Sequence, residues 1–383
     1  MNWSVPPLID SPSPSAPGIL RWSIGLLVML VAGFFLAVYL LSPEELRNKK
    51  HLMLVAFAAP LLIWSLIFGG RLVGYGVQSA RVNARNQVVA LRRVQWQRWA
   101  NQTLNLLAWS RQTALGPQDH ALMVSEQSPV NQGNRLVISE FADLPAWESR
   151  TLLIARVLHP ISAFGQAHPL TQPLTLLWQV PPAAANEADW GQLLTQEAQR
   201  QSLSFTAIAP FASHDFSQWL LTAYDQPLNG LLCLVFIDVS DRSPASEEAV
   251  SLLIAADDLC RQANITPKAQ LLRPLLTPAS TLPQAMTQLC AQQCAPADLS
   301  AGWQRAQSDI VRDNIPVACA ELNMRFRATQ RFDIDNALGL SGIARHATQV
   351  TLAAEHHGNN LLFTEHQGQC LVQQLRHPPG ASQ

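Results

Sequence analysis

Charged residues are scarce in this chain of 383 residues, and the two signs almost cancel. Asp, Glu, Lys and Arg make up 14% of the sequence, and the formal net charge is −1 at pH 7. A nucleic-acid-binding domain would present a basic face, so this composition argues against that class. Familiar catalytic motifs are missing as well, because the sequence contains no P-loop, no GxGxxG after a strand, no GxSxG elbow and no HExxH.

Two long stretches, residues 23–41 and 52–70, carry no charged residue at all. Each is close to the roughly 20 apolar residues that a helix needs to cross a bilayer. A buried core helix is normally shorter, and a signal peptide would have a basic start and a small-residue cleavage site. Pro60 would kink the second stretch without stopping it from spanning. We expect a transmembrane hairpin over residues 23–76, preceded by a disordered Pro/Ser tail over residues 1–22.

Acidic residues are absent between the second stretch and Asp119, whereas arginine is abundant there. The connection over residues 42–51 has cations of its own, which taken alone would place it in the cytoplasm. Counted near all span ends, the positive-inside rule favours both termini in the cytoplasm. We expect a two-span protein of a bacterial inner membrane with a cytoplasmic globular domain. A periplasmic domain is the alternative, since long domains can be translocated whatever their charge.

Proline and glycine are absent from residues 78–111, which predicts a helix that continues from the second span. We assign residues 77–115 to this Arg-rich juxtamembrane helix. It is either a stalk with a solvated basic face or a surface helix held by anionic lipid, at about 1 kcal/mol per cation. The candidate membrane-surface contacts are Arg81, Arg85, Arg92, Arg93 and Arg98.

Cysteine is absent before Cys233, and the six cysteines that follow are scattered among apolar residues. Small domains stapled by disulfides look different. Cys290 and Cys294 would share one face of a predicted helix, but their spacing is neither a zinc knuckle nor a redox CxxC. We expect buried thiols.

Residues 116–383 have the composition of a globular domain. Short apolar runs predict strands at residues 135–139, 151–158, 174–180, 204–209, 231–239, 269–272 and 370–375. Helical patterns alternate with them at residues 188–201, 215–224, 244–263, 282–294 and 337–355. Ser243 would cap the third of these helices, with Pro244 at its first position. Such alternation indicates an α/β sheet covered on both faces.

From residue 229 onward the order of elements becomes informative. A central strand (GLLCLVFIDV), an Ala/Leu-rich helix (SEEAVSLLIAADDL) and a strand segment (TPKAQLLRP) come first. A helix with a Pro-Ala-Asp-Leu turn (LPQAMTQLCAQQCAPADL), a Gly/Ala-rich helix (DNALGLSGIARHATQVTLAAE) and a terminal hairpin (NNLLFTEHQGQCLVQQLR) follow. This succession resembles the second half of a thiolase or β-ketoacyl synthase domain, over residues 229–383. The resemblance implies a layered, thiolase-like α/β domain and a homodimer.

The resemblance also implies catalytic residues that this chain lacks. Family members use a cysteine at the tip of a helix in the first half, where this chain has none. They place one histidine after the Pro-Ala-Asp-Leu-like turn and another directly after a glycine. Here residues 303–309 contain no histidine, and Leu340 follows Gly339. Because condensing chemistry needs a thiolate and histidines, we expect no catalytic residue and no cofactor.

Other polar clusters have ordinary structural explanations. His356 and His357 could form a metal site with Glu355 or His366, but adjacent histidines on a helix point apart, so a solvated helix end is expected and no metal ligand is assigned. Asp333 and Asp335 alternate like a metal-binding pair, but Asp335 and Asn336 are better explained as helix caps. His214 and Asp215 fit the first turn of a helix, with a pocket role as the alternative. The small residues Gly339, Gly342 and Ala344 would permit close helix packing.

Two functions are compatible with these features. The first is a membrane-anchored, non-enzymatic adaptor or scaffold that binds a protein partner. It is similar in character to the inner-membrane accessory proteins of bacterial type VI secretion clusters, including the lipase-adaptor kind, which hold an effector. The second is a membrane enzyme or sensor that retains an acyl or lipid-related pocket. The expected partners are a protein and membrane lipids.

Overall fold

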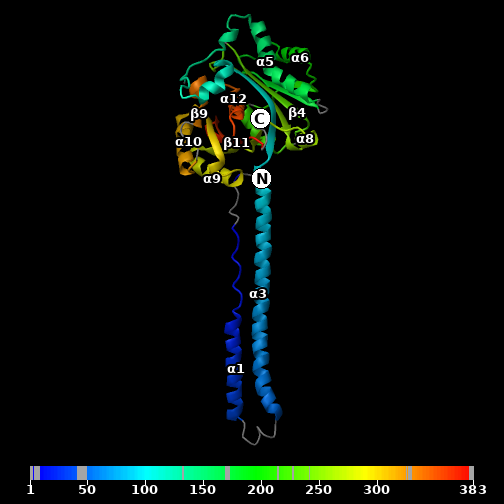
Figure 1. Ribbon diagram of the computed structural model, residues 1–383, viewed down its shortest axis with the longest axis vertical. Coiled ribbons are helices and arrows are strands. Elements are labelled where there is room, and N and C mark those ends of the chain that lie inside the picture. Colours follow the sequence, from blue (N-terminus) through cyan, green and yellow to red (C-terminus); the bar gives the residue numbers. More distant parts are fainter. Residues whose placement is uncertain are drawn as a thin grey trace. The chain divides into compact units, whose positions relative to one another are not determined.

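The computed structural model describes residues 3, 9–40, 50–131, 133–168, 173–213, 215–226, 228–240, 242–324, 326 and 330–378. The chain divides into two compact units. One unit holds Asn2–Trp96 and the other holds Gln97–Gln383. Figure 1 shows long helices in the first unit and a mixed α/β domain in the second.

The first unit is built from two helices, α1 (Ile19–Leu40) and the first part of α3 (Lys50–Ala100). Both are long and apolar enough to cross a membrane, and none of the residues in their apolar windows is buried. This confirms the prediction of two long apolar helices. Pro60 lies inside α3. The loop between the helices lies outside the described residues.

The start of α1 packs beside the middle of α3, so the two helices run antiparallel (Figure 1). The ring of Phe68 lies 5.2 Å from that of Trp22 and stacks at 4.8 Å on that of Trp64. The Nε1 of Trp64 donates a hydrogen bond to the carbonyl of Trp22 over 3.0 Å. Amphipathic aromatic side chains of this kind favour the headgroup layer of a membrane.

The Pro/Ser tail runs back along α3 in the same unit. Residues 9–18 form neither helix nor strand. The backbone N–H and carbonyl of Ser11 bond to the side-chain amide of Asn86 over 2.9 and 3.0 Å. Arg93, one of the candidate lipid contacts, lies 3.5 Å from the carboxylate of Asp10.

The α/β unit begins earlier than the sequence predicts. Helix α3 ends at Ala100, and the next residues form strand β1 (Thr103–Thr113). The expected helix over residues 77–115 is therefore wrong in its last part. Leu104 and Leu106 are buried in the sheet, where a strand with apolar neighbours on both sides is more stable than a solvated helix.

Eleven described strands form one mixed sheet, in the order β3-β2-β4-β5-β1-β6-β11-β10-β8-β9, with β7 paired to β11. The elements between residues 97 and 268 are β1, η1 (Gly116–Gln118), α4 (Asp119–Val124), η2 (Ser139–Phe141), α5 (Ala146–Ala167), β2 (Leu174–Gln179), α6 (Trp190–Arg200), β3 (Ala207–Pro210), α7 (Phe216–Ala223), β4 (Leu231–Asp238), β5 (Glu248–Ala256) and α8 (Asp257–Gln262). The remaining elements are β6 (Ala269–Leu272), β7 (Leu275–Pro278), η3 (Ala279–Thr281), α9 (Leu282–Gln292), η4 (Pro296–Asp298), β8 (Leu299–Arg305), α10 (Asp309–Glu321), β9 (Arg331–Asp333), α11 (Ile334–Leu338), α12 (Arg345–Glu355), β10 (Asn359–His366) and β11 (Gln369–Arg376).

The strand order reveals an internal duplication. The first repeat contains β1 to β5, and from the outer edge of the sheet inward their order is β3-β2-β4-β5-β1. The second repeat contains β6, β8, β9, β10 and β11, and from the opposite edge inward their order is β9-β8-β10-β11-β6. Position by position along the chain, these two orders are the same. In each repeat the fifth strand is antiparallel to both of its neighbours. The two first strands, β1 and β6, pair antiparallel at the centre and join the repeats.

The duplication places the boundary between the repeats after β5. Strands β4 and β5 therefore belong to the first repeat, and the second repeat begins near β6 rather than at residue 229. The residues before 229 complete the same fold. One apolar cluster lies on each face of the sheet. Alternate residues of β4 contribute to the two clusters, which confirms that this strand is buried on both sides.

Several predicted elements are confirmed: β2, β3, β4, β6 and β11 among the strands, and α6, α7 and α9 among the helices. The strand expected at residues 151–158 is wrong, because this run lies within helix α5. Its buried residues recur with helical spacing, at Leu153, Ile154, Val157, Leu158 and Ile161. A short apolar run cannot be assigned by itself.

Three further predictions are wrong. Residues 135–139 form no strand. The helix expected at residues 244–263 is the strand β5 followed by the short helix α8, because pairing with β4 and β1 outweighs the helix propensity of its alanines and leucines. The helix expected at residues 337–355 is broken into α11 and α12. Gly339 has φ of +75° at the break, a conformation that favours glycine.

Candidate functional site

A cavity of about 340 Å³ lies where the two repeats meet, and we call it the junction cavity. The first repeat contributes the start of α7, the end of β4 and residues 243–245. The second repeat contributes residues 341–343 and the start of α12. The break between α11 and α12 therefore supplies part of the cavity wall.

Helix α7 brings a serine to the cavity. Asp215 is its N-cap and accepts a hydrogen bond from the backbone N–H of Gln218 over 2.7 Å, which confirms the predicted helix turn. His214 lies outside the described residues. Two residues after the cap, the Oγ of Ser217 lies 2.8 Å from the Nδ1 of His346. Ser217 and His346 are each only 1% exposed.

The environment of His346 keeps its imidazole neutral. Burial, followed by the nearby charge of Arg345, lowers the pKa of His346 to about 3. A general base works best when its pKa lies near the pH at which it operates. The buried Ser217–His346 pair therefore has the geometry of a nucleophile and base, but the base is weak.

Asp238 ends β4 and faces the second repeat across the cavity. Its carboxylate accepts hydrogen bonds from the backbone N–H of Ile343, over 2.9 Å, and from the Oγ of Ser243, over 3.3 Å. Burial raises the pKa of Asp238 to about 6. A Cβ on Gly342 would lie 1.5 Å from an oxygen of Asp238. Gly342 lies in the loop between α11 and α12, so it permits this close approach of Asp238 rather than the helix packing that the sequence predicts.

A fully buried ion network lies at the end of β8, next to the cavity. The guanidinium of Arg305 donates to Glu248 on β5, with Nη1 3.0 Å from Oε2, and from Nε to Asp335 on α11 over 2.8 Å. It also donates to the carbonyl of Arg345 over 2.9 Å. Burial lowers the pKa of Arg305, but the two carboxylates outweigh it and hold the pKa above its usual value.

Asp335 is thus not the helix cap that the sequence predicts. Asp333 caps α11 instead, because its carboxylate accepts from the backbone N–H of Asn336 over 3.1 Å. Asp335 lies inside the helix and is buried. Burial raises its pKa, although Arg305 acts in the opposite direction.

Arg345 lines the junction cavity from the first turn of α12. Its half-buried side chain has no hydrogen bond or ion pair with any other described residue. Burial lowers the pKa of Arg345, with Asp215 acting in the opposite direction. Arg305 and Arg345 are therefore neighbours, but only Arg305 forms ion pairs with other described residues.

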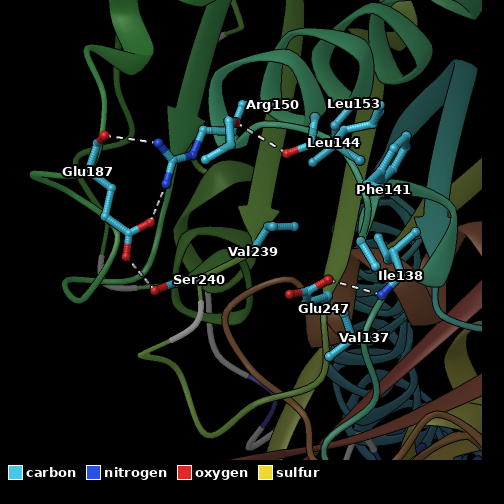
Figure 2. Close-up of a pocket in the computed structure, with 13 residues that line it drawn as sticks. Val137, Ile138, Phe141, Leu144, Arg150, Leu153, Glu187, Val239, Ser240 and Glu247 are labelled. Atoms are coloured by element: carbon cyan, nitrogen blue, oxygen red, sulfur yellow. Dashed lines mark hydrogen bonds and ion pairs between the residues drawn. The ribbon is translucent and has the colours of Figure 1, made fainter.

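A second cavity, of about 160 Å³, lies beside α5 in the first repeat, and we call it the α5 pocket (Figure 2). One wall is polar. Arg150 donates to the carboxylate of Glu187 over 2.6 Å, and the Oγ of Ser240 donates to the same carboxylate over 2.7 Å. The other wall is apolar and includes Phe141 and Leu144. Glu247 also lines the pocket, and its carboxylate accepts a hydrogen bond from the backbone N–H of Ile138 over 2.9 Å, so the pocket has both polar and apolar walls.

The six cysteines are free, and five of them are buried, which confirms the prediction of buried thiols for those five. Burial raises the pKa of Cys233 and Cys370 to about 12. Cys294 is half-buried and lies beyond the end of α9, so it does not share a helix face with Cys290. A hydrogen bond from Cys294 lowers the pKa of Cys290 and raises that of Cys294.

The two adjacent histidines lie at the end of α12, as expected, where His356 is the C-cap residue. The ring of His356 lies 5.7 Å from that of Trp303 and 6.0 Å from that of His120. Burial lowers the pKa of both His120 and His356. Within the described part of the chain, no three His, Cys, Asp or Glu side chains are arranged to hold a metal ion.

The α/β unit has a mixed α/β fold, as the sequence predicts. The ishigamide ketosynthase/chain length factor is similar, with a TM-score of 0.49 and 12% identity over 72% of this chain and 99% of that chain. The 3-oxoacyl-[acyl-carrier-protein] synthase III from Aquifex aeolicus VF5 has a TM-score of 0.43 and 10% identity over 73% of this chain and 99% of that one. No protein family and no curated protein matches the sequence. These likenesses concern the fold alone.

Proposed function

We propose that this chain is a non-enzymatic adaptor, anchored in a bacterial inner membrane by α1 and α3, which binds a protein partner. The partner class is an effector or another component of a secretion system. The observation that carries the proposal is the state of the polar groups where the repeats meet. Ser217 is hydrogen-bonded to His346, whose pKa burial lowers to about 3, and Arg305 is hydrogen-bonded to two carboxylates.

The cysteines support the same proposal. Nucleophilic catalysis by cysteine requires a thiolate that the substrate can reach. Cys233 lies inside β4 with no exposed surface, and burial holds its pKa at about 12. A chain whose nucleophiles are buried or already paired is suited to binding rather than to turnover.

The surface beside the α5 pocket offers a place for a protein partner. Trp147 lies in the first turn of α5 and is 67% exposed, and Val137, which lines the pocket, is 44% exposed. Tryptophan is enriched among the residues that dominate the free energy of protein–protein binding. The apolar part of the pocket wall, next to an exposed tryptophan, fits an apolar side chain of a partner.

The test is to capture partners with the tagged full chain from solubilised membranes and identify them by mass spectrometry. We expect one stoichiometric protein partner, whose recovery falls with Trp147→Ala. Ile310→Ala is the matched control, because Ile310 is 71% exposed on α10 of the other repeat. A preparation without a stoichiometric partner would count against the adaptor, and equal losses with both variants would count against the α5 pocket.

The second candidate function is an enzyme or sensor with an acyl or lipid-related pocket. The specific observation in its favour is the 2.8 Å contact between Ser217 and His346 in the wall of the junction cavity. A fluorophosphonate probe would label an activated serine, with Ser217→Ala as control, and native mass spectrometry would detect a copurifying acyl ligand. Labelling at Ser217 or a bound acyl group would favour this function over the adaptor.

Membrane orientation decides which partners the adaptor can meet. The cation count near the ends of the spans supports a cytoplasmic domain, with a periplasmic domain as the alternative. Reporter fusions at both ends of the full chain distinguish these two. We expect both termini to report the cytoplasm.

A further inference from the structure

We propose that the junction cavity binds a small ligand through one anionic group, a carboxylate or a phosphate, with Arg345 as its counter-ion. The proposal goes beyond the adaptor function and does not depend on it. It assigns a binding role to a cavity whose catalytic pairing is weak.

The first argument is the unpaired guanidinium. Arg345 is half-buried in the cavity wall and forms no hydrogen bond or ion pair with the other described residues. Removing a charged group from water is unfavourable unless an opposite charge and hydrogen bonds replace the water. Arg305 has such replacements from two hydrogen-bonded carboxylates, whereas Asp215 acts on Arg345 without a hydrogen bond. An anion in the cavity would supply them.

Other hydrogen-bond donors line the same cavity as Arg345. The Oγ of Ser341 accepts a hydrogen bond from Gln307 over 3.0 Å, and its own hydroxyl proton goes to no described acceptor. Asp215 takes the N–H of Gln218 at the start of α7, which leaves the N–H groups of Phe216 and Ser217 without an acceptor inside the helix. A guanidinium, a hydroxyl and a helix start together suit carboxylate or phosphate oxygens.

The carboxylates in the cavity wall limit the affinity without excluding an anion. Asp215 caps α7, so one of its carboxylate oxygens already accepts a hydrogen bond from the N–H of Gln218. Asp238 accepts hydrogen bonds from Ile343 and Ser243. Since the charge of Asp238 repels an anion in the cavity, removing it should tighten anion binding.

The volume restricts the ligand to a small one. About 340 Å³ lies at the lower end of the range for small-molecule pockets. The anionic group belongs either to a free metabolite-sized molecule or to an acidic side chain of a protein partner. Both offer the same chemistry to Arg345.

The test uses the purified full chain in detergent, titrated with inorganic phosphate and with acetate at constant ionic strength set by chloride. Calorimetry and the thermal midpoint give the affinity. We expect saturable binding of at least one anion, weakened by about ten- to a hundredfold in Arg345→Gln, which corresponds to the loss of one charge-assisted hydrogen-bonded contact. Asp238→Asn should bind more tightly, and Arg345→Lys should retain part of the affinity.

Arg312→Gln is the matched control, since Arg312 lies on α10 and already pairs with Asp309. The proposal is overturned if the unmodified chain shows no response beyond that to chloride, or if Arg345→Gln and Arg312→Gln behave alike. Ser341→Ala provides a second variant in case Arg345→Gln does not fold. Unchanged anion binding in Ser341→Ala would count against a contact between the Ser341 hydroxyl and the anion. Competition between phosphate and a captured partner distinguishes an acidic side chain from a free ligand. Loss of partner capture alone would affect the adaptor proposal and not this one.

Discussion

Arg305 and Arg345 are joined by a hydrogen bond, yet only the guanidinium of Arg305 is paired with carboxylates. Arg305 is fully buried and donates to Glu248, to Asp335 and to the carbonyl of Arg345. Arg345 is half-buried beside a cavity and has none of these carboxylate partners among the described residues. Burial alone therefore does not identify a charged side chain with a binding role. What marks such a side chain is that its hydrogen bonds are not already made within the protein.

The Arg305 network also has a structural task, because it crosses the boundary between the repeats. Glu248 lies on β5 of the first repeat, while Arg305 and Asp335 belong to the second. The hydroxyl of Thr348 on α12 donates to the same Glu248 carboxylate. The duplicated halves are therefore joined by buried ion pairs in addition to the β1–β6 pairing.

The largest effect should follow from removing one carboxylate charge from this network. Glu248→Gln leaves Arg305 with one carboxylate partner in a fully buried site, and we expect a loss of about 3–5 kcal/mol in the free energy of unfolding. Denaturant unfolding of the full chain, followed by tryptophan fluorescence, measures it. Asp258→Asn is the control, because Asp258 pairs with Arg261 at the surface and is 81% exposed. Similar losses in both variants would contradict the importance of this network.

The next effect is the pH dependence of stability caused by Asp238, which lines the junction cavity. Burial raises the pKa of Asp238 to about 6 from an ordinary value of 3.8, so folding favours the protonated form. The stabilisation is complete below the ordinary pKa and is lost as the pH rises through about 6. The shift corresponds to roughly 3 kcal/mol. Glu248 adds to the shift, whereas Ile343, Ser243 and Arg305 oppose it.

The measurement compares the full chain with its Asp238→Asn variant between pH 4 and pH 8. We expect the difference in free energy of unfolding to shift in favour of the variant as the pH rises, most steeply between the ordinary pKa of 3.8 and about 6, and to level off above it. A difference that stays constant over this range would mean that Asp238 titrates normally. The exposed Asp258→Asn variant again supplies the reference.

The sequence predicts much of the fold and little of the site. Runs of apolar residues identify α1, α3 and the buried strand β4, because length and composition decide those elements locally. The strand β5 is missed, since its alanines and leucines form a strand only through pairing with β4 and β1. Helix α5 is missed because one apolar run fits either structure.

The Arg305 network could not be predicted for a different reason. Arg305 and Glu248 lie 57 positions apart and meet only through the fold. The one available signal is an arginine at the end of an apolar strand, which resembles a solvated strand end. The pairing of Ser217 with His346 spans 129 positions and has no local signal either.

The third effect concerns the unpaired Arg345. Arg345→Met removes a half-buried charge that has no partner among the described residues, and we expect stability to rise by about 1 kcal/mol. Arg305→Met is the matched variant and should destabilise, because Glu248 and Asp335 then lose their shared partner. Unfolding of both variants in denaturant gives the comparison. A loss in Arg345→Met as large as that in Arg305→Met would show that Arg345 is paired after all.

The smallest effect concerns the exposed arginines of α3, which differ from both buried ones. Helix α3 continues without interruption to Ala100, so at 1.5 Å per residue Arg81 lies about 16 Å beyond Gly70 along the helix and Arg98 about 42 Å beyond it. Attraction between a cation and anionic lipid is worth about 1 kcal/mol at the surface and falls off within a Debye length of about 10 Å. Lipid contact should therefore decline along the series of candidate residues.

A photoreactive amino acid placed in turn at positions 81, 85, 92, 93 and 98 of the full chain, in native membranes, measures that decline. We expect lipid crosslinks at position 81, fewer at 85, and almost none at 98. Equal yields at all five positions would show that α3 lies along the membrane surface, as a lipid-held helix would. No crosslinks at any position would leave the helix as a solvated stalk. In that case Arg81, Arg85, Arg92 and Arg98 would remain exposed to a protein partner, whereas Arg93 already pairs with Asp10.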